Sequence, residues 1–309
     1  MNRILVLLLA VLSLFSVSAQ QDPQFSQNMF NKLANNPGFA GSEEGISTSV
    51  LHRSQWMGYG DDGAAASTQN FSIDTEIEFL NGGVGLNIVK DNIAQFSNLG
   101  IQASYAYRTN LGVGQIGMGI SVGVFQSGLD GSDFKYAQPG DNAIPSGSVQ
   151  GSKLDFGAGA YFNTQDVYIG ISSAHMTEPE IDWSDGTRYP LARHYFLISG
   201  YYHEINDKIS LNPSIYLKSD GATSQLDVNT NLIYTNSKDE KMWGGVSYRV
   251  DEGLILLAGM DITKDLSFGI GYDLTTINPM GNSFEAMLGY SFSIERNKAI
   301  SRHKNPRFL

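Results

Sequence analysis

The stretch IQASYAYR, residues 101–108, alternates between two kinds of side chain. Ile101, Ala103, Tyr105 and Tyr107 share one face of an extended strand, and Gln, Ser, Ala and Arg occupy the positions between them. Successive side chains of a β-strand point to opposite faces, so one face meets an apolar environment and the other a polar or crowded one. LSFGIGYDL (266–274) and FEAMLGYSFSI (284–294) repeat this pattern, which predicts an all-β chain.

Segments of this kind recur about fourteen times between residues 45 and 294. Many approach the 9–11 residues that a tilted membrane strand requires, and an even number is typical of bacterial single-chain barrels. We therefore predict a transmembrane outer-membrane β-barrel of about 14 antiparallel strands over residues 45–294. The predicted strands are 45–53, 67–74, 82–90, 98–109, 115–125, 152–162, 166–173, 194–203, 208–217, 225–234, 241–250, 254–262, 266–274 and 283–294.

The predicted connections have different lengths at the two ends of this barrel. With the N-terminus in the periplasm, the connections after odd strands face outward and include the two longest, 126–151 and 174–193. The connections after even strands are all short, as periplasmic turns are in outer-membrane barrels. A secreted soluble β-sandwich or jelly roll, for example a carbohydrate-binding β-protein, is the alternative, because it is also built of alternating strands.

The first nineteen residues predict export from the cytoplasm. Arg3 precedes the apolar run ILVLLLAVLSLF (4–15), and VSA (17–19) forms a small-residue cleavage site, as in a secretory signal peptide. We expect the mature chain to begin at Gln20 or Gln21. No later stretch reaches the ~18 apolar residues that a membrane helix needs. The expected location is the cell outer membrane, with its lipid as one partner.

Composition narrows the possible functions. The formal charge of −11 argues against a nucleic-acid partner, since phosphate binding requires clustered Lys and Arg. The chain has no Cys, which excludes disulfides and thiolate metal sites. Its 34 Gly are many, and small residues on the polar strand faces fit a lumen that is partly occupied by other backbone.

Residues 20–44 differ from the rest of the chain and predict a short periplasmic helix followed by a turn. Asp22 is a suitable N-cap with Pro23 at the first helical position, and Asn36-Pro37 ends the pattern. An apolar stripe recurs at intervals of four residues, so this helix would lie on the barrel rim, fill the lumen as a plug, or dock on a partner. Its candidate partner-binding residues are Asp22, Pro23, Phe25, Met29, Leu33, Asn36 and Pro37.

The C-terminal residues 295–309 are expected to form a basic periplasmic tail. A solvated, disordered tail is the simpler interpretation, but its apolar end after a basic run is typical of a segment that docks. Arg307 and Phe308 are therefore candidate partner-binding residues, and so is Trp183 in the predicted outer connection 174–193.

Motifs for catalysis and cofactors match only superficially. GVGQIG (112–117) and GISVG (119–123) lie in alternating strands, whereas a dinucleotide loop or a nucleophile elbow requires a following helix. The five His lack close ligand spacing, so we assign no catalytic, cofactor-binding or metal residue and do not expect an enzyme. The acidic stretches GLDGSD (128–133) and EIDWSDG (180–186) leave calcium binding open, although neither has a complete EF-hand loop.

The order of several short motifs resembles the PorP/SprF family of the type IX secretion system, outer-membrane proteins of Bacteroidetes. These motifs are QDPQFSQ (21–27), NPGFAG (36–41), HRSQWMGYGDDGA (52–64), GGVGLNIVKDNIAQF (82–96), SYAY (104–107), FEAMLGYSF (284–292) and PRFL (306–309). The resemblance covers nearly the whole mature chain. Gly38, where Ala is usual, and Leu309 are its small departures.

The resemblance implies a barrel without enzymatic activity that supports export or cell-surface anchoring of a secreted adhesin, in secretion or gliding. The implied partners are the adhesin or its C-terminal domain and type IX components of the periplasmic ring or the peptidoglycan. A channel for small solutes is the alternative for a barrel of this kind.

Overall fold

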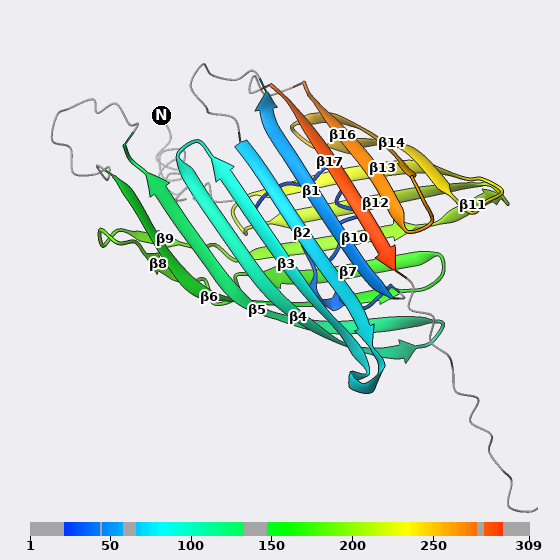
Figure 1. The fold of residues 1–309 in the computed structure, drawn as a ribbon, viewed down its shortest axis with the longest axis horizontal. Coiled ribbons are helices and arrows are strands. Elements are labelled where there is room, and N and C mark those ends of the chain that lie inside the picture. The colour runs from blue at the N-terminus through cyan, green and yellow to red at the C-terminus, as the bar shows by residue number, and fades with distance from the viewer. Residues whose placement is uncertain (1–21, 44, 58–65, 133–146, 277–280, 293–309) are drawn as a thin grey trace, which may run out of the picture.

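The computed structural model describes residues 22–43, 45–57, 66–132, 147–276 and 281–292, and it forms an antiparallel β-barrel (Figure 1). The predicted signal peptide 1–19 and tail 295–309 lie outside these residues. The barrel closes because β1 pairs with β17 as well as with β2. Its strands are β1 (Ile46–Met57), β2 (Ala66–Ile77), β3 (Gly82–Ile93), β4 (Phe96–Leu111), β5 (Gly114–Asp130), β6 (Ser148–Asn163), β7 (Val167–Ala174), β10 (His194–Tyr201), β11 (His203–Asn206), β12 (Ile209–Ser219), β13 (Ser224–Thr235), β14 (Lys241–Arg249), β15 (Gly253–Asp261), β16 (Leu266–Thr275) and β17 (Asn282–Phe292).

The barrel has fourteen strand positions, as predicted. Fifteen strands belong to the sheet, but β10 and β11 pair with successive parts of β12 and are interrupted only at Tyr202, so they share one position. The predicted strands coincide with the observed ones, and the main difference is that several observed strands extend further at their ends. A closed barrel rather than two stacked sheets excludes the β-sandwich alternative.

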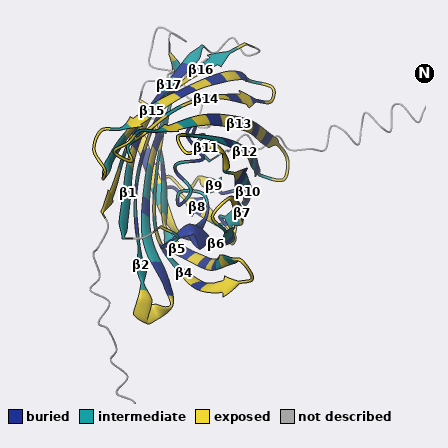
Figure 2. Cartoon of the chain, turned by 90° about the vertical axis from the view of Figure 1, so that its right-hand side faces the viewer, coloured by how far each residue is buried: buried dark blue, intermediate teal, exposed yellow. Residues whose placement is uncertain are grey.

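The burial pattern of the strands is inverted relative to a soluble protein. On β5, Ile120 is 66% exposed while the neighbouring Ser121 is only 6% exposed. Figure 2 shows this alternation of exposed and buried residues along the strands. The exterior is apolar and the interior carries polar and charged side chains, which is the arrangement that a barrel in lipid requires.

The two ends of the barrel differ as the sequence predicts. One end, called here the loop end, is where β1, β5 and β7 finish and where the long connection 175–193 lies. The other, called the turn end, carries short connections such as 112–113 and 164–166, and the 3₁₀ helix η2 (Glu78–Leu80). Within 175–193, β8 (Glu180–Asp182) and β9 (Arg188–Pro190) form a separate hairpin.

The prediction of a short helix near the N-terminus is wrong. The chain from Asp22 to Asn36 forms turns, and the 3₁₀ helix η1 (Pro37–Phe39) is the only helix in residues 22–43. The physical reason lies in the surroundings, because the backbone N–H groups of Ser26 and Gln27 donate to the Glu285 carboxylate. In the predicted helix these two N–H groups would donate to the carbonyls of Asp22 and Pro23, so the wall side chain takes donors that the helix requires. In the described part of the chain, no helix is long and apolar enough to cross a membrane.

Candidate functional site

Residues 22–41, called here the plug segment, run through the barrel from the loop end to the turn end. The backbone N–H of Asp22 lies 3.2 Å from Nε2 of His194, the first residue of β10 after the long connection. At the other end, the N–H of Gly41 donates to Asp74 Oδ2 at 2.8 Å, close to the end of β2. Because β1 begins directly after this segment, the chain enters the barrel wall at the turn end.

A buried group of charged side chains holds the first part of the plug segment. This group, called the arginine cluster, contains two cations and three carboxylates from five strands. Arg53 Nη2 lies 2.6 Å from Asp273 Oδ2, and Arg249 bridges Asp273 at 3.2 Å and Asp227 at 3.0 Å. Buried charges are stable only when they are paired and hydrogen-bonded. Its members are Arg53, Asp227, Arg249, Asp273 and Glu285.

The arginine cluster binds Ser26 and Gln27 directly. Glu285 accepts the Ser26 N–H at 2.7 Å and the Gln27 N–H at 2.8 Å. The Ser26 hydroxyl donates to Asp273 Oδ1 at 2.7 Å and accepts from Arg53 Nη1 at 2.5 Å. Charge-assisted hydrogen bonds of this kind are about twice as strong as neutral ones. The wall therefore fixes the segment through its backbone as well as through its side chains.

The apolar residues of the predicted stripe contact separate patches of the wall. Phe25 packs with Leu51 and Met287. Met29 packs with Ile255 and Leu257. Leu33 belongs to the largest buried cluster, which also includes Phe39, Ala40, Ala106, Tyr161, Tyr168, Phe196, Ile198 and Tyr216. Because each side chain reaches a different wall, the segment buries apolar surface on several sides rather than along one helical face.

Glycines on β5 and β6 form the seat for Asn36–Gly38. A Cβ on Gly119 would lie 2.4 Å from the backbone N of Gly38, and one on Gly117 would lie 2.3 Å from its O. Asn36 caps η1 by accepting the Gly38 N–H at 2.8 Å, while its Nδ2 donates to the carbonyls of Ala160 and Ile171. The glycines of GVGQIG (112–117) and GISVG (119–123) thus allow the backbone of the plug segment to approach the backbone of the wall, as glycine within strands often does.

Lys32 is enclosed by aromatic rings near the turn end. Its Nζ lies 4.3 Å from the ring centroid of Tyr168 and 5.5 Å from that of Phe39. These distances fall within the range of cation–π attraction, which is stronger when the cation is shielded from water.

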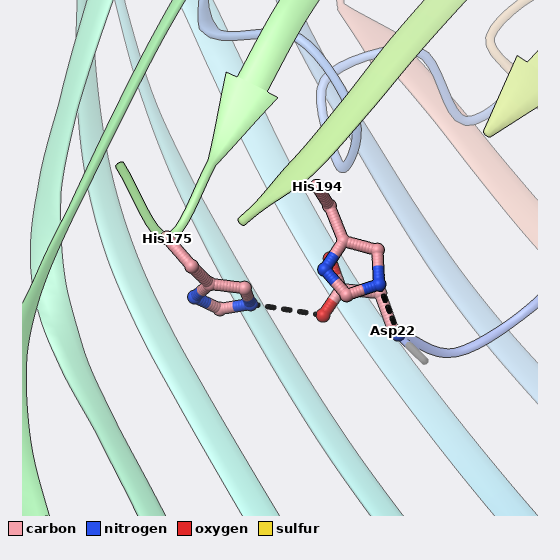
Figure 3. A group of neighbouring side chains, drawn as sticks. All are labelled: Asp22, His175 and His194. Atoms are coloured by element: carbon pink, nitrogen blue, oxygen red, sulfur yellow. Dashed lines mark hydrogen bonds and ion pairs between the residues drawn. The ribbon is translucent and has the colours of Figure 1, made fainter. Parts of the chain in front are cut away.

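Two histidines surround Asp22 at the loop end (Figure 3). His175 Nε2 lies 2.9 Å from Asp22 Oδ1, and Lys218 Nζ donates to the Asp22 carbonyl at 2.7 Å. Burial raises the pKa of Asp22, but the charges of His175, His194 and Lys218 hold that pKa well below its usual range. Burial lowers the pKa of the His175 imidazole, but the carboxylates of Asp22 and Asp155 more than offset this and raise it to about 10.

The structure brings together the predicted residues of the N-terminal segment and separates them from Trp183. Asp22, Pro23, Phe25, Met29, Leu33, Asn36 and Pro37 all lie in the lumen. Trp183 is buried in a cluster at the loop end with Leu129, Val149, Ile181 and Leu191. Arg307 and Phe308 lie outside the described residues.

Sequence reasoning missed the wall residues that bind the plug segment. Arg53, Arg249 and Glu285 stand on the polar faces of strands, and His175 follows β7. A charged residue on the polar face of an alternating strand could have indicated these wall residues, because a charge buried in the lumen requires a partner. The pairing itself depends on register between strands far apart in sequence.

A closed barrel with an apolar exterior and a lumen crossed by its own N-terminal segment defines an outer-membrane β-barrel protein. Residues 17–290 match the family described as type IX secretion system membrane protein PorP/SprF, so the chain belongs to that family. No curated protein gives a significant match.

Solved structures of other barrels share the fold, and two of them illustrate the likeness. One is the toluene transporter TbuX of Ralstonia pickettii, at 13% identity over 84% of this chain and 92% of that one, with a TM-score of 0.51. The other is a deletion mutant of the monoaromatic hydrocarbon channel TodX, at 12% identity over 85% and 94%, with a TM-score of 0.50. Both show that this fold is that of known outer-membrane barrels.

Proposed function

We propose that this protein supports the export or cell-surface anchoring of a secreted adhesin by protein–protein recognition, within type IX secretion. Membership in the PorP/SprF family implies an outer-membrane role in that system. The observation that carries the proposal is the occupied lumen, in which Phe25, Met29 and Leu33 are each at most 5% exposed. A barrel crossed along its length by its own chain offers its rims and loops, rather than an open pore, for recognition.

The outward surface for the adhesin is the loop end. The β8–β9 hairpin is anchored there, because Ile181 and Trp183 are buried and Trp183 stacks on Tyr189 at a centroid distance of 5.5 Å. Figure 2 draws this hairpin within the ring of strands. The hairpin also presents the exposed charges Glu180, Asp182, Asp185 and Arg188. A rigid support with exposed charged side chains suits recognition of a folded C-terminal domain.

The turn end would face the periplasmic components of the secretion system. This assignment follows from the short connections there and from the predicted direction of export. The basic tail predicted for residues 295–309, with Arg307 and Phe308, is the candidate partner-binding segment on the periplasmic side.

The test combines adhesin display with conductance. Deleting residues 22–40 while retaining the signal peptide should abolish surface display of the secreted adhesin and should give conductance in planar bilayers where the intact protein gives little. Replacing the four exposed hairpin charges with Ser or Asn should impair display without creating conductance. Normal display by both variants would overturn the recognition proposal, and steady conductance by the intact protein would favour a solute channel.

The adhesin itself is identified by purification. The intact barrel, solubilised from outer membranes in detergent, should retain the adhesin or ring components, and the hairpin-charge variant should lose the adhesin alone. Retention of neither by the intact protein would contradict the proposal.

A further inference from the structure

Three potential metal ligands meet where the plug segment begins. Asp22 comes from the plug segment, His175 directly follows β7, and His194 begins β10. One ligand atom from each lies within 4.8 Å of the other two. Figure 3 shows both imidazoles directed toward Asp22 from neighbouring elements of the wall. All three residues are at least partly buried, and both histidines are fully so.

An oxygen atom lies close to the other nitrogen of each imidazole. His175 Nδ1 lies 2.9 Å from Asp155 Oδ2, and His194 Nδ1 lies 3.0 Å from the Ala192 carbonyl oxygen. His175 Nε2 lies 2.9 Å from Asp22 Oδ1, and His194 Nε2 accepts the backbone N–H of Asp22. Metal-binding histidines almost always have such a carboxylate or carbonyl behind them, because it fixes the ring and its tautomer.

Charge and space at the site also suit a dication. The carboxylates of Asp22, Asp91 and Asp155 lie in this region and face one nearby lysine, Lys218. A cavity of about 90 Å³ adjoins Asp22, Asp91 and both histidines. Such a volume accommodates a water molecule, and the side chains of Asp22, Asp91 and the two histidines supply the polar partners that an ordered water needs.

We propose that Asp22, His175 and His194 bind a zinc ion, with water from the cavity at the fourth position. Two imidazoles and a carboxylate are typical ligands of tetrahedral zinc, whereas calcium and magnesium prefer six or more oxygen ligands. The ion would replace the hydrogen between His175 Nε2 and the Asp22 carboxylate, and His194 Nε2 would exchange the Asp22 backbone N–H for the ion. It would connect the start of the plug segment to β7 and β10, and so hold the segment in the lumen.

The experiment uses the full mature chain in detergent, without an affinity tag, after chelator treatment and dialysis. Calorimetric titration with ZnCl₂ should give one ion per chain, and CaCl₂ or MgCl₂ should give no binding. CoCl₂ should produce the intense visible absorption of a four-coordinate site. D22N, H175Q and H194Q should each weaken zinc binding more than tenfold, and Asp155→Asn should weaken it about 10- to 100-fold.

The control is the double variant H52Q/H203Q, which changes two exposed histidines on β1 and β11 and should bind zinc as the unaltered chain does. Circular dichroism and heat-dependent gel migration establish that each barrel is folded. If a ligand variant does not fold, the cobalt spectrum of the unaltered chain, with and without the control substitutions, decides the question. Absence of zinc binding, or its loss in H52Q/H203Q alone, would overturn the proposal.

Discussion

Arg53 and Glu285 are direct partners in the ladder between β1 and β17, and Arg53 Nη1 lies 3.4 Å from Glu285 Oε2. Both side chains are buried in the lumen. The same Glu285 carboxylate accepts two backbone N–H groups of the plug segment. Glu285 therefore contributes both to the closure of the barrel and to holding the plug segment in place inside it.

Glu285→Gln should lower the free energy of unfolding by about 2 kcal/mol, because hydrogen bonds to a charged group contribute about 1.5–3 kcal/mol each and the amide keeps only one acceptor oxygen. Denaturant unfolding in lipid vesicles measures this change. Glu204→Gln on β11, where the side chain is exposed, is the matched control and should be nearly neutral. Equal stability of the two variants would contradict the role of Glu285.

Gly119→Ala should displace the plug segment, because the new Cβ would lie 2.4 Å from Pro37 and Gly38 backbone atoms that cannot move independently. Trypsin reports the displacement, since Lys32 is the only Lys or Arg between residues 22 and 52. We expect cleavage after Lys32 in this variant and protection in the unaltered protein. Gly100→Ala, where the nearest atom would be 3.6 Å away, is the control and should remain protected.

Asn36→Ala should weaken the docking of η1 by about 1–2 kcal/mol. The substitution removes the cap on Gly38 and two hydrogen bonds to wall carbonyls, which then lack a partner. Faster hydrogen exchange of the Gly38 and Phe39 amides would measure the effect. Asn110→Ala, at an exposed position next to a turn, should leave these amides unchanged.

Trp183→Ala should release the β8–β9 hairpin without unfolding the barrel, since truncating a buried Trp costs about 3–5 kcal/mol. Trypsin should then cleave after Arg188 or Arg193, while the heat-dependent gel migration of the barrel is retained. Tyr248→Ala, on the exposed face of β14, is the control for loss of an aromatic ring. Continued resistance of the hairpin to trypsin would show that Trp183 does not anchor it.

The sequence predicts the barrel well because alternation is local. Ile101 and Ser104 can be assigned to opposite faces from their positions alone, and the fourteen strands follow from repeating that reasoning. The route of the plug segment could not be predicted in the same way. Phe25, Met29 and Leu33 have helical spacing, but that spacing assumes one apolar face and a backbone that bonds to itself. The wall of the lumen supplies three apolar patches and a carboxylate for the backbone instead.

The histidine site also could not be predicted from the sequence. His175 and His194 are separated by a long connection, and Asp22 is far from both in sequence, so no local spacing reveals them. Only the adjacency of β7 and β10, with the plug segment crossing beside them, brings the three together.

The order of residues along the chain affects how Ser26 can be bound during assembly of the barrel. Ser26 is synthesised before every strand, yet its partners Asp273 and Glu285 belong to the last two strands. The segment cannot acquire its full set of bonds until the final hairpin has arrived beside β1. The complete set of these bonds therefore exists only in the closed barrel, where the earliest residues bind to side chains of the two latest strands.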